Sequence, residues 1–138
     1  MTGRPGRIRI AAALIDDGGG QVFLVRKRGT AAFMQAGGKI DPGETPVEAL
    51  LRELAEELGL AVEPDDLRYL GRFIAEAANE PGHVLEAELF HLRVSRREFR
   101  VAAEIEEAMW VSIDAAQDLP LAPFTCDHVL ALARLLEY

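Results

Sequence analysis

The segment Gly38–Leu60 constrains the fold more than any other part of the chain, because its residues mark both ends of a helix. Thr45 is a favourable N-cap, and Pro46 suits the first helical position. Glu48 follows Thr45 by three residues, as in a capping box. Gly59 fits the left-handed position that commonly ends a helix. The sequence therefore predicts a glycine-bearing loop and then a helix from Pro46 to the residue before Gly59.

The expected helix carries an apolar stripe and, beside it, a row of carboxylates. Because successive helical residues turn by roughly 100°, the apolar side chains share one face. They are Val47, Leu50, Leu51, Leu54 and Leu58. Glu53, Glu56 and Glu57 lie on the adjacent flank. A solvated acidic face is the ordinary explanation, although like charges four residues apart repel by roughly 0.2–0.5 kcal/mol. A bound divalent cation would turn this repulsion into coordination.

The order of the fixed residues decides between these explanations. The pattern is G-x5-E-x7-R-E-U-x-E-E-x-G-U, in which U is apolar, and the chain fills every fixed position. The residues concerned are Gly38, Glu44, Arg52, Glu53, Leu54, Glu56, Glu57, Gly59 and Leu60. This segment resembles the signature box of the Nudix hydrolases, and so many matches in one order argue against coincidence. The resemblance implies a MutT-like enzyme that uses Mg²⁺ or Mn²⁺ to cleave a diphosphate linkage in a nucleoside diphosphate derivative.

The same resemblance implies roles for individual side chains. Glu56 and Glu57 are the expected metal ligands, since Mg²⁺ prefers oxygen donors, and Glu53 is a ligand or the general base. Arg52 precedes Glu56 by four residues and is expected to orient it. Glu44 is expected to tie the loop to the helix.

A further carboxylate is expected outside the box. In the Nudix family a ligand or base often precedes a strand that carries tryptophan, here Trp110. Glu104 matches that position best, whereas Glu106 and Glu107 fit a solvated acidic turn as well. We therefore expect Glu104 to act as a fourth metal ligand or as the base.

Residues before the helix are candidates for contact with the substrate. Cations at the end of a strand are most often solvated, but these lie just upstream of a glycine pair that lets the backbone approach phosphates. An aromatic ring in the preceding loop either caps the core or stacks on a base. The candidates are Arg26, Arg28, Phe33, Gly37, Gly38 and Lys39.

The remaining chain predicts further strands and two more helices. The expected strands are Arg7–Ile15 and Val22–Arg28, which form a hairpin, and Leu67–Ala78, His83–Val94 and Glu104–Ser112. The expected helices are Asp114–Leu119 and Phe124–Leu136. Because strands and helices alternate only in part, we expect an α/β fold with a mixed sheet between helices, as one domain over residues 1–138. The Nudix resemblance implies the same α/β/α sandwich.

Composition limits the partners and the compartment. The net charge of −8 argues against general binding to nucleic acid, and no apolar run approaches the ~20 residues of a membrane helix. The start of the chain reads as a strand and not as a signal peptide. The single cysteine, Cys126, cannot form an internal disulfide, which fits a reducing compartment. We expect a cytoplasmic protein that binds a small nucleotide, and a homodimer is left open.

Two alternatives to an active diphosphate hydrolase remain. A Nudix-like module could bind a nucleotide metabolite as a sensor, although a sensor has no need of the complete carboxylate set. A diphosphate isomerase would require a further catalytic cysteine, and Cys126 stands too late in the chain. The substrate is not specified, because residues 119–125 contain no asparagine for an oxidised base and residues 71–78 no proline typical of the ADP-ribose branch.

Overall fold

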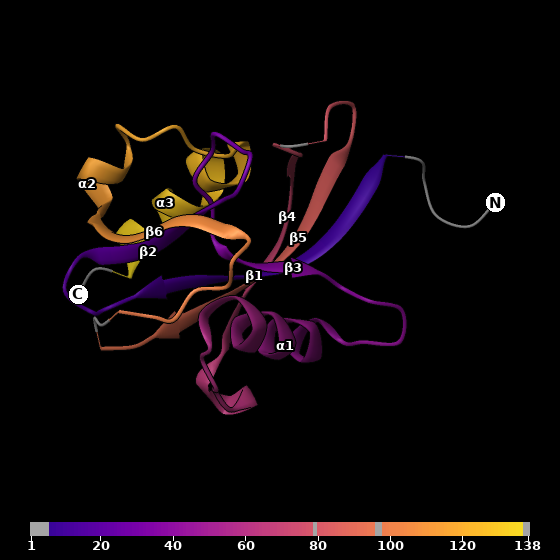
Figure 1. Cartoon of the computed structure of the whole chain (residues 1–138), viewed down its shortest axis with the longest axis horizontal. Coiled ribbons are helices and arrows are strands. Elements are labelled where there is room, and N and C mark those ends of the chain that lie inside the picture. The colour runs from indigo at the N-terminus through magenta and orange to yellow at the C-terminus, as the bar shows by residue number, and fades with distance from the viewer. Residues whose placement is uncertain (1–5, 79, 96–97, 137–138) are drawn as a thin grey trace.

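A mixed sheet forms the centre of the computed structural model, which describes residues 6–78, 80–95 and 98–136 (Figure 1). The strands are β1 (Arg7–Asp16), β2 (Gln21–Lys27), β3 (Ala36–Lys39), β4 (Arg68–Glu76), β5 (Val84–Arg93) and β6 (Ile105–Ser112). Their order is β4-β5-β1-β2-β6, and β3 pairs with β1. The pair β1–β5 is parallel and the other pairs are antiparallel. All five predicted strands are present.

Helices cover both faces of this sheet, so the predicted α/β/α sandwich is confirmed (Figure 1). They are α1 (Pro46–Leu58), a 3₁₀ turn (Pro64–Asp66), α2 (Ile113–Ala116), a π-helical turn (Thr125–Val129) and α3 (Leu130–Leu135). Helix α1 lies on one face, and α2 and α3 lie on the other. No helix within the described residues is long and apolar enough to cross a membrane.

Strand β1 separates two hydrophobic cores, because successive residues of a strand point to opposite faces. Ala11, Ala13 and Ile15 belong to the core under α1, whereas Ala12 and Leu14 belong to the core under α3. Both faces of β1 are therefore buried, which explains its nearly continuous apolar run. Packing on the first core fixes α1 against the sheet, next to β3.

Helix α1 forms as predicted, with both ends capped. The Thr45 hydroxyl accepts a hydrogen bond from the Glu48 amide at 3.1 Å, and the Glu48 carboxylate accepts one from the Thr45 amide at 2.9 Å. Gly59 ends the helix in the left-handed conformation, with φ 62°. The helix is thus defined locally, and its apolar stripe then docks it on the sheet.

The glycine pair lies in a strand, so the expected loop at this position is wrong. Gly37 pairs with Ala12, and Gly38 pairs with Ala11. A Cβ added to Gly37 would stand 2.2 Å from the carbonyl oxygen of Ala11, and the φ of Gly37 is +145°. Glycine is required here because two backbones approach closely, and the turn itself lies between β3 and α1.

The predicted helix Phe124–Leu136 forms with a widened first turn. Thr125–Val129 is π-helical, and the Leu130 amide donates to the carbonyl oxygen of Thr125. Helix α3 continues from this turn. The predicted helix Asp114–Leu119 corresponds to α2, which is shorter.

We predict that Gly37→Ala destabilises the fold far more than Gly43→Ala. Both glycines have positive φ, +145° and +86°, but only a Cβ on Gly37 meets backbone atoms, and none lies within 4 Å of one on Gly43. We expect Gly37→Ala to lower the free energy of unfolding by about 3 kcal/mol or more, and Gly43→Ala by about 1 kcal/mol. Urea denaturation at pH 7 measures both, and equal losses would contradict the close approach of β1 and β3.

Candidate active site

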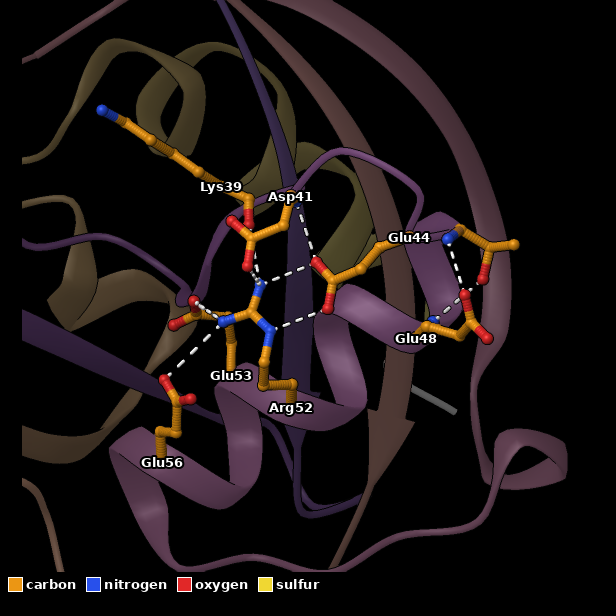
Figure 2. A network of polar contacts seen from close by, with 8 residues as sticks. Lys39, Asp41, Glu44, Glu48, Arg52, Glu53 and Glu56 are labelled. Atoms are coloured by element: carbon orange, nitrogen blue, oxygen red, sulfur yellow. Dashed lines mark hydrogen bonds and ion pairs between the residues drawn. The ribbon is translucent and has the colours of Figure 1, made fainter.

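The Arg52 side chain connects the turn between β3 and α1 with the carboxylates of α1 (Figure 2). Its guanidinium donates to both oxygens of Glu44, at 2.8 Å each, and to the Lys39 carbonyl oxygen at 3.1 Å. It also donates to Glu53 at 2.6 Å, while Glu56 is an ion-pair partner at 3.7 Å. Arg52 was expected to orient Glu56, but the carboxylate that it holds more closely is Glu53.

Glu44 ties the loop to the helix, as predicted. Its carboxylate accepts hydrogen bonds from Arg52 and, at 2.8 Å, from the Asp41 amide. The bond from Arg52, followed by that from Asp41, lowers the pKa of Glu44 to about 2. Glu44 is therefore ionised over the physiological range, and the clamp on Arg52 does not open with pH.

Glu53 lies against the backbone of β3. A Cβ added to Gly38 would stand 2.4 Å from the carboxyl carbon of Glu53. A side chain at position 38 would therefore displace the Glu53 carboxylate from this place. Gly38 thus places Glu53 beside the strand, and Arg52 holds it there from the other side.

Glu57 is buried at the centre of the site, with 1% of its surface exposed. One carboxylate oxygen accepts a hydrogen bond from the Gly37 amide at 3.0 Å. The other, Oε2, is buried without a hydrogen-bond partner among the described residues, and the Lys27 ammonium lies 3.6 Å away. Burial raises the pKa of Glu57 to about 7, against the opposing effects of Gly37 and Lys27. A carboxylate in this position strongly favours an added positive charge.

Glu104 lies in a turn that is attached to the end of α1. The Ala102 amide donates to the Glu57 carbonyl oxygen at 2.8 Å, and the Ile105 amide donates to the Ala102 carbonyl oxygen at 2.9 Å. The negative charge of Glu104, like that of Glu53, raises the pKa of Glu57. The structure therefore brings Glu53 and Glu104 each within electrostatic reach of Glu57.

The neighbouring acidic residues differ from Glu104. Glu106 forms an ion pair with Arg28 at 2.9 Å, and Glu107 forms one with Arg26 at 2.8 Å. Within the part of the chain that the structure describes, no such partner is found for the Glu104 carboxylate. This difference separates Glu104 from the two residues for which a solvated acidic turn was an equally good explanation.

The donor set fits a hard divalent cation. It consists of carboxylate oxygens, which Mg²⁺ and Mn²⁺ prefer, and it includes the buried oxygen of Glu57 that lacks a partner. In residues 6–78, 80–95 and 98–136, no three acidic, histidine or cysteine side chains are close enough to hold an ion as they stand. Glu56 is the outlying member, because its side chain is 58% exposed.

A cavity of about 150 Å³ opens beside β3, on the face of the sheet that α3 covers. Much of its wall is apolar, with Ile10, Ala12 and Phe124 among its residues. Of the predicted substrate residues, Gly37, Gly38 and Lys39 line it. Glu80 forms an ion pair with Lys39 at 3.6 Å across the same space.

The other predicted substrate residues are engaged elsewhere. Arg26 and Arg28 hold Glu107 and Glu106, and the Arg28 side chain also donates to the Ala103 carbonyl oxygen at 3.1 Å. The ring of Phe33 is 4% exposed and belongs to the core under α3.

Lys27 belongs to the same cationic strand end, but only its neighbours Arg26 and Arg28 were chosen as substrate residues. The Lys27 ammonium lies beside Glu57, and Lys27 lines the cavity. Alternation along β2 separates Lys27 from Arg26, so a signal that distinguishes the two was present in the sequence.

The comparisons agree with this geometry. The family model described as NUDIX domain matches residues 6–131. The chain belongs to the Nudix family. It is 29% identical over 121 residues to a CTP pyrophosphohydrolase of Escherichia coli, an alignment that covers 84% of each chain. A MutT Nudix hydrolase of Burkholderia pseudomallei superposes with a TM-score of 0.69 at 27% identity, over 95% of this chain and 96% of that one.

A second relative aligns over a shorter stretch. The chain is 44% identical over 57 residues to an 8-oxo-dGTP diphosphatase of Haemophilus influenzae. The match covers 38% of this chain and 42% of that protein, so it spans less than half the length of that relative. The predicted family and the predicted class of MutT-like pyrophosphohydrolases are confirmed by these matches. Nudix hydrolases generally use divalent metal ions.

Three expectations stay predictions. They are the cytoplasmic location, the homodimer, and the extent of the domain over residues 1–138, part of which lies outside the described residues.

We predict that the metal-free protein loses stability as the pH rises from 5 to 8, and that Glu57→Gln abolishes this loss. The folded pKa of Glu57, about 7, lies above the ordinary value of 4.5. Its contribution is therefore complete below pH 4.5 and is lost as the pH rises through 7. The shift corresponds to a loss of about 2–3 kcal/mol between pH 5 and pH 8.

Urea denaturation in EDTA at both pH values measures this effect as the difference between wild type and Glu57→Gln. Glutamine resembles the protonated carboxyl group, so the variant should be the more stable protein at pH 8. If the two proteins have the same pH dependence, Glu57 is not the buried acid that the geometry describes.

Proposed function

We propose that the chain is a divalent-metal-dependent pyrophosphohydrolase that cleaves the diphosphate linkage of a nucleotide. The observation that carries this proposal is the Glu57 oxygen that is buried without a hydrogen-bond partner among the described residues, 3.6 Å from the Lys27 ammonium. A buried polar atom of this kind requires an explanation, because desolvation without a partner costs free energy. A cation bound at this oxygen would explain its burial, because the cation would be the missing partner.

Glu53, Glu56, Glu57 and Glu104 would hold the metal. Arg52 holds Glu53 in place, and the Gly37 amide fixes one oxygen of Glu57, so that its other oxygen remains for the cation. When bound, the metal neutralises phosphate charge and lowers the pKa of a coordinated water. Glu53 or Glu104 accepts the proton of the attacking water as general base.

The cavity would receive the nucleoside, and the strand β3 would lie along the phosphates. Gly37 and Gly38 present backbone without side chains at the cavity wall, and Lys27 and Lys39 add positive charge there. The water oxygen joins one phosphorus atom while the bond from that atom to the bridging oxygen breaks. The bridging oxygen then leaves with the other phosphate.

Nucleoside triphosphates are the first substrates to test. The relative that aligns over 84% of the chain is named for CTP, and the one that aligns over 38% of it is named for 8-oxo-dGTP. A sensor without turnover is the contrasting outcome. The carboxylates argue against it, because binding alone does not require a buried Glu57 with further acidic residues near it, whose charges repel phosphate.

The experiment is a turnover screen over nucleoside triphosphates, nucleotide sugars, dinucleoside polyphosphates and ADP-ribose, with Mg²⁺ and with EDTA. We predict that the protein hydrolyses its substrate in the presence of Mg²⁺ and not in the presence of EDTA. Glu57→Gln and Glu104→Gln should each lower kcat by at least ~100-fold, because each removes a charged ligand or the base. Glu106→Gln and Glu107→Gln are matched controls, since their carboxylates pair with Arg28 and Arg26.

The controls should stay within about threefold of wild type in kcat, and circular dichroism should show that all four variants fold. Equal losses at the three positions outside the helix would remove Glu104 from the site. An undiminished rate for Glu57→Gln would contradict the metal assignment itself.

A further inference from the structure

Lysine is rare in this chain, and it occurs where the cavity lies. Of the 15 lysines and arginines, only Lys27 and Lys39 are lysines, and both line the cavity. Each ammonium has a carboxylate partner at 3.6 Å, which is Glu57 for Lys27 and Glu80 for Lys39. These separations exceed the roughly 2.7–2.9 Å of a charge-assisted hydrogen bond. Both ammonium groups are therefore held loosely in their ion pairs.

The lysine side chain suits a positive charge that changes its partner. Its ammonium is a compact charge on a flexible stem, whereas a guanidinium is a planar fork, as in the paired hydrogen bonds from Arg52 to Glu44. The backbone of Lys27 is fixed, because its carbonyl oxygen accepts hydrogen bonds from the amide and the hydroxyl of Thr30. Its side chain, however, is 38% exposed. Rotation of the side chain alone would therefore move this ammonium.

The partner of Lys27 distinguishes it from Lys39. The Lys27 ammonium lies 3.6 Å from Oε2 of Glu57, the buried oxygen at which we propose that a cation binds. Mg²⁺ stands about 2.1 Å from its oxygen ligands, so an ion at Oε2 would lie within about 6 Å of an unmoved ammonium. Like charges at this separation disfavour each other. The ammonium and the metal therefore compete for one carboxylate oxygen.

We propose that Lys27 is the counter-ion of Glu57 in the metal-free protein, and that its ammonium gives up this oxygen to the metal and turns into the cavity. This inference rests on the proposed function and adds a positioning role for Lys27. The ammonium partly neutralises the buried carboxylate before an ion arrives. After the exchange, Lys27 carries its charge into the space that it shares with Gly37 and Gly38. Metal binding would thus prepare the cavity for an anionic ligand.

The first test is the affinity for Mg²⁺ alone, measured by calorimetry at pH 9, well above the Glu57 pKa of about 7. Lys27→Met keeps an apolar stem and removes the competing charge, so Mg²⁺ should bind at least ~5-fold more tightly. Lys27→Arg keeps the charge and should restore an affinity within about twofold of wild type. Lys39→Met is the matched control, because it removes a cavity lysine whose partner is Glu80, and should also stay within about twofold.

The second test follows the ammonium itself. An acetylating reagent attacks the neutral amine, and mass spectrometry assigns the product to Lys27 or Lys39, since the chain has no other lysine. Loss of a carboxylate partner favours the neutral amine, so millimolar Mg²⁺ should accelerate acetylation of Lys27 at least ~5-fold relative to EDTA. Lys39 is the internal reference, and its rate should change by less than about twofold.

Two results would overturn the inference, provided that melting temperatures show the variants to be folded. One is a Lys27→Met protein that binds Mg²⁺ no more tightly than wild type, and the other is a Lys27 acetylation rate that Mg²⁺ leaves unchanged. Failure of wild type to bind Mg²⁺ would overturn it as well. A purely structural lysine would lower the melting temperature when replaced, but its loss would not strengthen metal binding.

Turnover of nucleotides in Mg²⁺ separates this inference from the proposed function. A protein that gives both expected results but hydrolyses no nucleotide would contradict the proposed hydrolase and support the role of Lys27. A protein that hydrolyses nucleotides in Mg²⁺, and whose Lys27→Met variant has the Mg²⁺ affinity of wild type, would support the hydrolase and overturn this role.

Discussion

The Glu57 carboxylate lies between helix α1 and strand β3 with 1% of its surface exposed, and the geometry of the site depends on this burial. One oxygen is fixed by the Gly37 amide, whereas the other has no hydrogen bond among the described residues. The cost of desolvating this group raises its pKa to about 7. Burial of the ionised carboxylate therefore lowers the stability of the folded protein, and the nearby Lys27 ammonium offsets only part of this loss. In return, the folded protein holds a preformed acceptor for positive charge.

The surrounding structure makes this arrangement possible. Glycines at positions 37 and 38 allow β3 to approach both β1 and the carboxylates of α1 without side chains in between. Arg52, locked by Glu44, neutralises Glu53 from the solvent side, so that the helix can carry several carboxylates on one flank. The acidic residues and the cavity lie on opposite faces of the sheet. The helix with the acidic residues covers one face, and the cavity opens on the other.

Local signals in the sequence predicted much of this fold. The capping residues Thr45 and Gly59 gave both ends of α1, and alternation gave the strands. The parallel pairing of β1 with β5 was not predicted, because these strands are far apart in the chain and no local signal reports their contact. The strand at Gly37 was missed for a related reason, since glycine predicts a turn unless the neighbouring backbone is known.

The site was predicted from a motif, which names residue types but not their partners. It identified Glu53 and Glu57 beside the strand, yet it assigned Arg52 to Glu56 and not to Glu53. Arg26 and Arg28 were chosen for their charge, but Glu107 and Glu106 engage them, and Lys27 faces the site instead.

The most direct test of the account is a calorimetric titration of Mg²⁺ at pH 6.5, in two buffers with different enthalpies of ionisation. Because the pKa of Glu57 is about 7, metal binding should displace its proton, and the observed enthalpy should differ between the buffers. Glu57→Gln should bind Mg²⁺ at least ~10-fold more weakly and without proton release. Equal affinity in the two proteins, or no dependence on the buffer in wild type, would contradict the claim that the buried carboxylate is the metal's acceptor.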